Sequence, residues 1–324
     1  MNPFSKTSNI SALSERRLIA KVCEKFGEAA ALPPPFGAGD DCALIRSGSL
    51  KKNVYATSDA VILGRHFSSE TDPFAAGEKL VKRNVSDIAA MGAVPFAALA
   101  SSICSPNLSL EWLENFCCGM GNAAVRYGIK IVGGDFASVK GDFFSTHLTI
   151  LGQSDDCPLT RTGASDGDYI CVTGELGASL ESGHHLSFEP RVAEGVFFAQ
   201  NAGITSCIDL SDGIASDIKN LIPQKLCAEI SAADIPLRKY GGRVATLKQS
   251  LCDGEDYELL FTFSGGESDM RKFKSAYGEK FGRPFYVLGK IKKANSAEEE
   301  NALILISEGR REVFKSGGFD HYQP

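Results

Sequence analysis

The sequence predicts an α/β or α+β protein of two domains, and three observations support this. Strand-like apolar runs alternate with amphipathic helical patterns along the whole chain, as in mixed folds. The 324 residues exceed the usual size of a single domain. A polar stretch rich in Gly, Asp and Thr, from Gln153 to Asp168, separates residues 1–152 from residues 153–324. We therefore expect an N-terminal and a C-terminal domain joined by this stretch.

The elements expected in the first domain follow from periodicity and boundary signals. A helix is expected from Ser14 to Phe26, because its apolar residues share one face and Gly27 follows it. Pro73 opens a long helix through Ala90, since proline is well tolerated in a first helical turn. Another long helix is expected over Leu110–Tyr127. The expected strands are Cys42–Ile45, Val54–Thr57, Phe96–Ile103, Ile129–Val132 and Phe143–Gly152.

The second domain shows the same mixture of patterns. Helices are expected over Pro190–Asn201 and Ile214–Leu226. The adjacent His184 and His185 are expected on a surface loop. The expected strands are Tyr169–Thr173, Ser206–Leu210, Tyr257–Phe263, Phe285–Leu288 and Leu303–Ile306. Periodicity alone does not give the order of the strands.

Composition limits the partners and the compartment. The net charge of −6 disfavours a nucleic-acid partner, which would require a basic face. The 10 cysteines form no C-x-x-C pair and lie in apolar stretches, so we expect buried cytosolic thiols. The N-terminal segment before Arg16 lacks an apolar signal core, and the longest apolar stretch, Ile88–Cys104, is too short to cross a bilayer. We expect a cytoplasmic protein with neither a nucleic-acid nor a membrane partner.

Several common nucleotide-binding motifs are absent from the sequence. No G-x-x-x-x-G-K-[ST] segment occurs, so a P-loop kinase is disfavoured. Gly37-Ala38-Gly39 begins like a dinucleotide fingerprint, but Cys42 stands at the third glycine position and two acids precede it. The sequence contains no protein-kinase H-R-D or D-F-G motif and no G-x-S-x-G elbow. Any nucleotide site therefore uses another arrangement.

Acidic residues recur beside small residues at five places, four of which adjoin strand-like runs. The segments are Gly39-Asp40-Asp41, Thr57-Ser58-Asp59, Val85-Ser86-Asp87, Gly133-Gly134-Asp135 and Asp209-Leu210-Ser211-Asp212-Gly213. If such segments end strands, their carboxylates share one cleft, where each close pair repels by roughly 1–4 kcal/mol. Hard cations relieve this repulsion, and Mg²⁺ bridging carboxylates to phosphates is the commonest case. The pattern therefore predicts metal-dependent phosphate chemistry.

Several of the acidic segments also have a purely structural alternative. The acids at 40 and 41 could form an ordinary turn before a strand, and Asp87 could lie on a solvated helix face. Ser211 or Asp212 could cap the helix that follows. Gly254-Glu255-Asp256-Tyr257-Glu258 could be a charged hairpin. The joint occurrence of these segments, in this order and spacing, favours a functional site over the separate alternatives.

Together with four further segments, these acids resemble the thiamine-monophosphate kinase family, within the aminoimidazole ribonucleotide synthetase-like superfamily. The four are Gly64-Arg65-His66-Phe67, Thr160-Arg161-Thr162-Gly163-Ala164, Gly254-Glu255-Asp256-Tyr257-Glu258-Leu259 and Gly317-Gly318-Phe319-Asp320-His321. The resemblance runs from about residue 14 to residue 322. It implies the two-domain fold of that superfamily and a homodimer whose N-terminal domains pair strands across the two-fold axis. It also implies ATP-dependent phosphorylation of thiamine monophosphate to thiamine diphosphate, the last step of thiamine diphosphate biosynthesis, with several Mg²⁺ ions.

The resemblance implies roles residue by residue. The implied Mg²⁺ ligands are Asp41, Thr57, Ser58, Asp59, Asp87, Asp135, Asp209 and Asp212. The implied ATP contacts are Gly134, Asp135, Arg161 and Ser211, and the implied thiamine phosphate contacts are His66, Glu255 and Phe319. No general base is nominated, because the acceptor phosphate is already ionised and phosphoryl transfer depends mainly on positioning and charge neutralisation.

The sequence departs from the family at one motif, and two other functions stay open. Asp253 stands where the family usually has a glycine. Another ATP-dependent synthetase of the superfamily would need a catalytic Cys or Lys in a Gly-rich N-terminal arm, whereas Met1–Arg16 contains neither Gly nor Cys. A non-catalytic sensor of nucleotide or thiamine would be expected to have lost acids, but the whole set is present.

Overall fold

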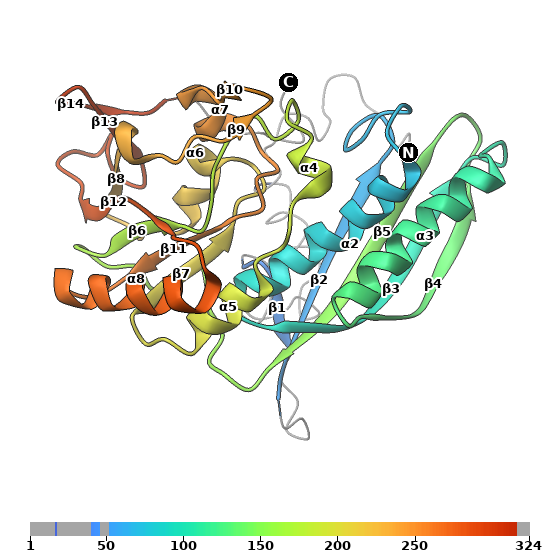
Figure 1. The fold of residues 1–324 in the computed structure, drawn as a ribbon, viewed down its shortest axis with the longest axis horizontal. Helices are drawn as coiled ribbons and strands as arrows, with labels where there is room; N and C mark the ends of the chain where they lie inside the picture. The colour runs from blue at the N-terminus through green and yellow to red at the C-terminus, as the bar shows by residue number, and fades with distance from the viewer. Residues whose placement is uncertain (1–16, 18–39, 46–51, 316–324) are drawn as a thin grey trace, which may run out of the picture.

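The computed structural model describes residues 17, 40–45 and 52–315, which form two large sheets (Figure 1). The first sheet has five strands in the order β1-β2-β5-β3-β4. Its strands are β1 (Ala43–Ile45), β2 (Asn53–Ile62), β3 (Val94–Cys104), β4 (Lys130–Ser138) and β5 (Phe144–Ser154). β3 and β4 run parallel, and the other neighbours are antiparallel. β4 therefore forms one edge of this sheet.

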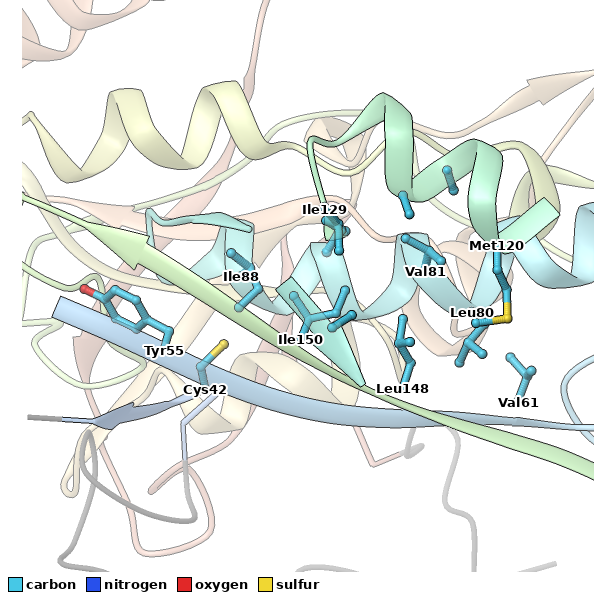
Figure 2. Close-up of a cluster of buried hydrophobic side chains, with 14 of the residues drawn as sticks. Cys42, Tyr55, Val61, Leu80, Val81, Ile88, Met120, Ile129, Leu148 and Ile150 are labelled. Carbon is cyan, nitrogen blue, oxygen red and sulfur yellow. The ribbon is translucent and has the colours of Figure 1, made fainter. Parts of the chain in front are cut away.

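Two long helices, α2 (Pro73–Ala90) and α3 (Leu110–Arg126), cover one face of the five-stranded sheet (Figure 1). α2 begins where expected, because the side chain of Asp72 accepts a hydrogen bond from the N–H of Phe74 and Pro73 occupies the first turn. The core lies between these helices and the sheet. Buried apolar side chains of α2, including Leu80 and Ile88, pack there with Leu148 and Ile150 of β5 (Figure 2).

The second sheet has seven strands in the order β14-β13-β8-β12-β6-β11-β7. They are β6 (Tyr169–Val172), β7 (Ile204–Asp209), β8 (Leu226–Ser231), β11 (Leu259–Phe263), β12 (Tyr286–Lys293), β13 (Leu303–Ser307) and β14 (Arg310–Val313). Five helices accompany them: α4 (His184–Ser187), α5 (Val192–Ala199), α6 (Ile214–Asp217), α7 (Leu247–Cys252) and α8 (Glu267–Phe281). The short strands β9 (Lys239–Tyr240) and β10 (Arg243–Val244) form a separate ribbon. Mixed sheets and helices confirm the predicted α/β or α+β class.

Helix α2 joins the two halves of the molecule. It packs on the first sheet and also contacts α4, α5 and β7, which belong to the second half (Figure 1). The approach of α5 is close, because a Cβ atom on Gly195 would lie 2.0 Å from the carbonyl oxygen of Ala89. The last turns of α2 therefore lie beside the end of β7, and acidic residues occur on both elements.

The expected elements agree with the structure best for long periodic segments. The helix over Pro73–Ala90 is confirmed to the residue, whereas the helix expected from Ser14 to Phe26 lies outside the described residues except for Arg17, which is helical. The helix expected over Ile214–Leu226 is wrong beyond Asn220, where a 3₁₀ turn over Ile218–Asn220 ends. Pro223 cannot donate a backbone hydrogen bond, and Leu226 begins β8 instead.

Two acidic segments lie inside strands and not at their ends. β2 continues through Thr57-Ser58-Asp59 to Ile62, and β4 continues through Gly133-Gly134-Asp135 to Ser138. The predicted strand ends at Thr57 and Val132 are therefore wrong. Apolar periodicity stops at these polar residues, but pairing with the neighbouring strands continues. Gly134 is required by that pairing, because a Cβ atom there would lie 1.6 Å from the carbonyl oxygen of Ala100 on β3.

Two further features bear on the sequence expectations. Within the described residues, no helix is long and apolar enough to cross a membrane. The nine cysteines of the described part are all free thiols. Cys117, Cys118 and Cys157 are exposed, so the expectation of buried thiols is wrong for these three.

Candidate functional site

Three carboxylates converge where α2 meets β7. Asp41 lies two residues before β1, Asp87 lies in the last turn of α2, and Asp209 ends β7. One carboxylate oxygen from each residue lies within 4.8 Å of the other two. Asp41 and Asp209 are buried, and Asp87 is half-buried. The structure therefore brings together three of the predicted metal ligands from three distant parts of the sequence.

Hydroxyl groups orient two of these carboxylates. Thr57 on β2 donates to Oδ2 of Asp87 at 2.7 Å, and Ser86 on α2 donates to Oδ2 of Asp209 at 2.6 Å. Burial nevertheless raises the pKa of Asp87 well above its ordinary value, and the nearby charge of Asp209 adds to this effect. Burial, followed by the charge of Asp41, raises the pKa of Asp209 in the same direction. Both shifts favour the protonated form, first because the carboxylates are buried and second because the acids repel each other.

The donor set fits a hard divalent cation. All three ligand groups are carboxylates, and oxygen ligands are those that Mg²⁺ prefers. Zinc sites generally use Cys or His ligands, and none belongs to this group. Two unit charges 4.8 Å apart repel by about 3 kcal/mol at an effective dielectric constant of 20. A divalent cation bound by the three acids would remove that repulsion, which is why such a cluster can be retained.

Arg161 approaches the cluster from the segment between the two sheets. Its Nε and Nη2 donate to the two carboxylate oxygens of Asp41 at 3.2 and 3.0 Å. Such a fork can equally hold a phosphate. The main-chain N–H of Arg161 donates to Asp40. Burial, reinforced by the charge of Asp41, raises the pKa of Asp40 to about 7. Asp40 thus anchors the arginine segment, and Asp41 orients the guanidinium.

The neighbouring acid and hydroxyl on β2 lie on different sides of the sheet. Asp59 faces α2, where its Oδ2 is 2.8 Å from Nε of Arg83 and its N–H donates to Asn84. The hydroxyl of Ser58 instead accepts a hydrogen bond from Thr149 of β5 at 3.0 Å. Successive strand side chains point to opposite faces, so the Ser58 hydroxyl is directed away from Asp87.

Gly134 and Asp135 lie on the far edge of the first sheet. Gly134 pairs with Ala100, and the same row continues through Leu148 to Asp59 on β2. Three strand spacings separate Asp59 from Gly134, or about 14 Å along the sheet. A cavity of about 680 Å³ lies against this edge, lined in part by Gly134 and Asp135. Within the described residues of one chain, these two predicted contacts therefore lie apart from the carboxylate cluster.

Ser211 and Asp212 occupy a turn that a further acid holds in place. The main-chain N–H groups of both residues donate to Oδ2 of Asp217, at 3.1 and 3.0 Å. Asp217 is buried on α6, and sequence reasoning missed it. Burial, followed by the charge of Asp212, raises its pKa well above the ordinary value. The sequence did contain a signal for this residue, because Asp217 lies one helical turn after the acidic segment Ser211-Asp212-Gly213.

A buried lysine connects two of the predicted substrate contacts. Nζ of Lys79 donates to the carbonyl oxygen of His66 at 2.7 Å and lies 2.7 Å from Oε1 of Glu255. It also lies 3.0 Å from Nδ1 of His185. The expected surface loop at His184 and His185 is wrong, since both belong to the half-buried helix α4. The third predicted contact, Phe319, lies outside the described residues.

Known proteins are similar to this chain over nearly its whole length. Residues 39–153 match the family model described as AIR synthase related protein, N-terminal domain. Thiamine-monophosphate kinase of Escherichia coli K12 is 31% identical over an alignment that covers 96% of this chain and 99% of that protein. The chain belongs to the thiamine-monophosphate kinase family. This membership confirms the resemblance drawn from the motifs.

Solved structures place both sheets within the fold of the thiamine-monophosphate kinase family. Thiamine-monophosphate kinase from Stenotrophomonas maltophilia K279a is 26% identical, with a TM-score of 0.68 over 92% of this chain and 98% of that one. AaThiL complexed with AMPPCP and TMP is 24% identical and has the same fold, with a TM-score of 0.78 over 98% of this chain and 100% of that one. The roles of individual residues stay predictions, to which the structure adds Lys79 and Asp217.

Proposed function

We propose that this chain transfers the γ-phosphoryl group of ATP to thiamine monophosphate, giving thiamine diphosphate and ADP. The similarity to the Escherichia coli kinase over nearly the full length of both chains carries this proposal. The fold shared with AaThiL, which was solved with AMPPCP and TMP, supports it. The site is suited to the reaction, because phosphoryl transfer needs positioning and charge neutralisation more than it needs covalent help. An ionised acceptor phosphate requires no strong general base.

The proposed ion-binding residues start from the cluster of Asp41, Asp87 and Asp209. The further proposed Mg²⁺ ligands are Thr57, Ser58, Asp59, Asp135 and Asp212. Bound Mg²⁺ would neutralise the charge of the ATP phosphates. Asp41 holds the Nε–Nη2 edge of the Arg161 guanidinium in place, which leaves the Nη1–Nη2 edge to donate to a phosphate. Gly134, Asp135 and Ser211 complete the proposed ATP contacts, and His66, Glu255 and Phe319 the proposed thiamine phosphate contacts.

The proposal includes a homodimer formed by the N-terminal domains. It also places the two domains at residues 1–152 and 153–324 and the protein in the cytoplasm. Every residue of β4 is exposed in the single chain. The apolar side chains of Val132 and Phe136 on β4 are 66 and 63% exposed, and that of Leu99 on the neighbouring β3 is 48% exposed. Apolar surface of this kind favours a protein partner. The side chains of Ser58 and Asp135 belong to the face turned away from α2, so a second copy would bring its own atoms toward them.

A single incubation tests the proposed reaction. The purified chain is mixed with ATP, Mg²⁺ and thiamine monophosphate, and the products are separated by chromatography. We expect equal amounts of thiamine diphosphate and ADP, and neither product when Mg²⁺ is removed by chelation. ADP without thiamine diphosphate would favour another ATP-dependent synthetase of the superfamily. Tight binding of both ligands without turnover would favour a sensor.

A further inference from the structure

Lys79 is a buried cation at the substrate end of the proposed site. Its side chain is 0% exposed, and lysine is almost never fully buried unless it is paired. Three acceptors surround Nζ: the carbonyl oxygen of His66 at 2.7 Å, Oε1 of Glu255 at 2.7 Å and Nδ1 of His185 at 3.0 Å. An ammonium group has three N–H donors and no acceptor, so these partners use all of its hydrogen-bonding capacity.

This arrangement fixes the protonation of both histidines. Nδ1 of His185 accepts from Lys79, so the proton of a neutral ring lies on Nε2. Burial and the charge of Lys79 lower the pKa of His185 to about 4, which agrees with a neutral ring. Nδ1 of His66 accepts from the N–H of Ile62 at 3.0 Å, which also places the His66 proton on Nε2. Glu255 is therefore the one partner of Lys79 that carries a counter-charge.

Glu255 is held at its backbone as well as at its side chain. Its φ of +64° is uncommon for a residue other than glycine and persists where the surroundings enforce it. Its N–H donates to the carbonyl oxygen of Ser211 at 2.7 Å, which ties it to a proposed ATP contact. Its carboxylate is tied to Lys79 and keeps 20% exposure, whereas Lys79 has none. A ligand can therefore reach Glu255 but not the ammonium behind it.

We propose that Lys79 is a positioning residue for thiamine monophosphate, orienting Glu255 and the main chain at His66 without touching the substrate. The inference rests on the proposed function, which makes His66 and Glu255 substrate contacts. One ammonium on α2 fixes a turn that follows β2 and a loop that precedes β11. The two sides of the substrate site, one from each half of the chain, are thus set against each other by a single group.

Lys82 provides a matched control for a test of Lys79. It lies on the same helix, is 2% exposed, and its Nζ donates to the carbonyl oxygen of Leu186 at 2.6 Å. Lys79→Met and Lys82→Met therefore each remove one buried ammonium from α2. We expect Lys79→Met to raise KM for thiamine monophosphate at least tenfold while KM for ATP stays within twofold. Lys82→Met should leave both constants within twofold. Calorimetric titration with thiamine monophosphate alone should show the same tenfold loss of affinity in Lys79→Met.

A double variant separates positioning from loss of structure. If Lys79 acts through Glu255, Lys79→Met combined with Glu255→Gln should impair thiamine monophosphate binding no more than the worse single variant. Effects that multiply, or equal KM changes for ATP and thiamine monophosphate in both lysine variants, would overturn the inference. If Lys79→Met does not fold, Lys79→Arg is used in its place. We expect Lys79→Arg to raise KM for thiamine monophosphate at least threefold and to leave KM for ATP unchanged. Two unchanged KM values would refute the positioning role of Lys79. Wild-type protein that neither binds nor phosphorylates thiamine monophosphate would instead refute the proposed function.

Discussion

Replacing Asp87 by asparagine should stabilise the metal-free protein while removing most of its activity. Asp87 has a carboxylate oxygen within 4.8 Å of oxygens from both Asp41 and Asp209. Each charged pair at that distance repels by about 3 kcal/mol at an effective dielectric constant of 20. Burial, with the charges of the neighbouring acids, raises the pKa of both Asp87 and Asp209, so protonation would relieve part of this repulsion when no metal is bound. We therefore expect a net gain of about 1 kcal/mol, or roughly 1–2 °C in melting temperature for a chain of 324 residues.

The change to asparagine is nearly isosteric and keeps the local hydrogen bond. The amide oxygen of asparagine can still accept from Thr57, which now donates to Asp87 at 2.7 Å. Thermal unfolding is measured at pH 8 with a chelator and again with saturating Mg²⁺. The wild-type protein should gain more stability from Mg²⁺ than the variant gains. In the activity assay we expect kcat to fall at least a hundredfold and the Mg²⁺ requirement to rise.

An exposed acid supplies the control for Asp87→Asn. Asp155 lies on the surface, with 69% of its side chain exposed, and pairs with Lys52 at 2.9 Å. Asp155→Asn removes the same charge and should change neither melting temperature nor kcat appreciably, because exposed ion pairs contribute little. The reasoning fails if Asp87→Asn is less stable than wild type without metal, or if it keeps the wild-type Mg²⁺ dependence.

Three further predictions concern the arginine fork, the pH dependence of stability and the edge of the first sheet. Arg161→Lys keeps the charge but loses the bidentate fork, so KM for ATP should rise about tenfold with little change in melting temperature; an unchanged KM would remove Arg161 from the ATP site. Because the pKa of Asp40 is raised from 3.8 to about 7, mainly by burial, the folded state binds a proton that the unfolded state lacks between these values. Urea titrations without metal should show the free energy of unfolding falling as pH rises from about 4 to 7. This fall should be less steep in Asp40→Asn. Equal pH dependence in the variant and the wild type would contradict the raised pKa of Asp40. Gly134→Ala places a Cβ atom 1.6 Å from a carbonyl oxygen of β3 and should lower the melting temperature by several degrees. The control is Gly121→Ala on α3, where a Cβ atom would have no atom within 4 Å and the melting temperature should not fall. Equal effects of the two substitutions would refute the close approach of β4 to β3 at Gly134.

Secondary structure could be predicted where local signals decided it. The helix over Pro73–Ala90 has an N-cap, a proline in its first turn and a continuous apolar face, and the structure matches it to the residue. The strands through Asp59 and Asp135 extend beyond their predicted ends because pairing with neighbouring strands continues across polar residues. The seven-stranded order also depends on pairings between segments far apart in the sequence, which periodicity does not encode.

The candidate site also contains some residues that the sequence predicted and others that only the packing of distant elements reveals. The convergence of Asp41, Asp87 and Asp209 was predicted from acids next to small residues, and the structure places their oxygens together. Lys79 was not predicted, because a lysine on an amphipathic helix usually points to solvent. Its partner His185 lies 106 residues further along the chain. Only the packing of α4 against α2 reveals that contact. Asp135 shows the opposite case, since its motif predicts a metal ligand, whereas within the described residues it lies apart from the carboxylate cluster.

The fate of the γ-phosphoryl group tests the proposed function most directly. ATP carrying radioactive phosphorus at the γ position is incubated with the protein, Mg²⁺ and thiamine monophosphate, with enzyme in excess so that a single turnover is followed. We predict that the label appears in thiamine diphosphate, at its terminal phosphate, as fast as ATP is consumed. Label that appears in inorganic phosphate instead, with no labelled thiamine diphosphate, would contradict phosphoryl transfer to thiamine monophosphate.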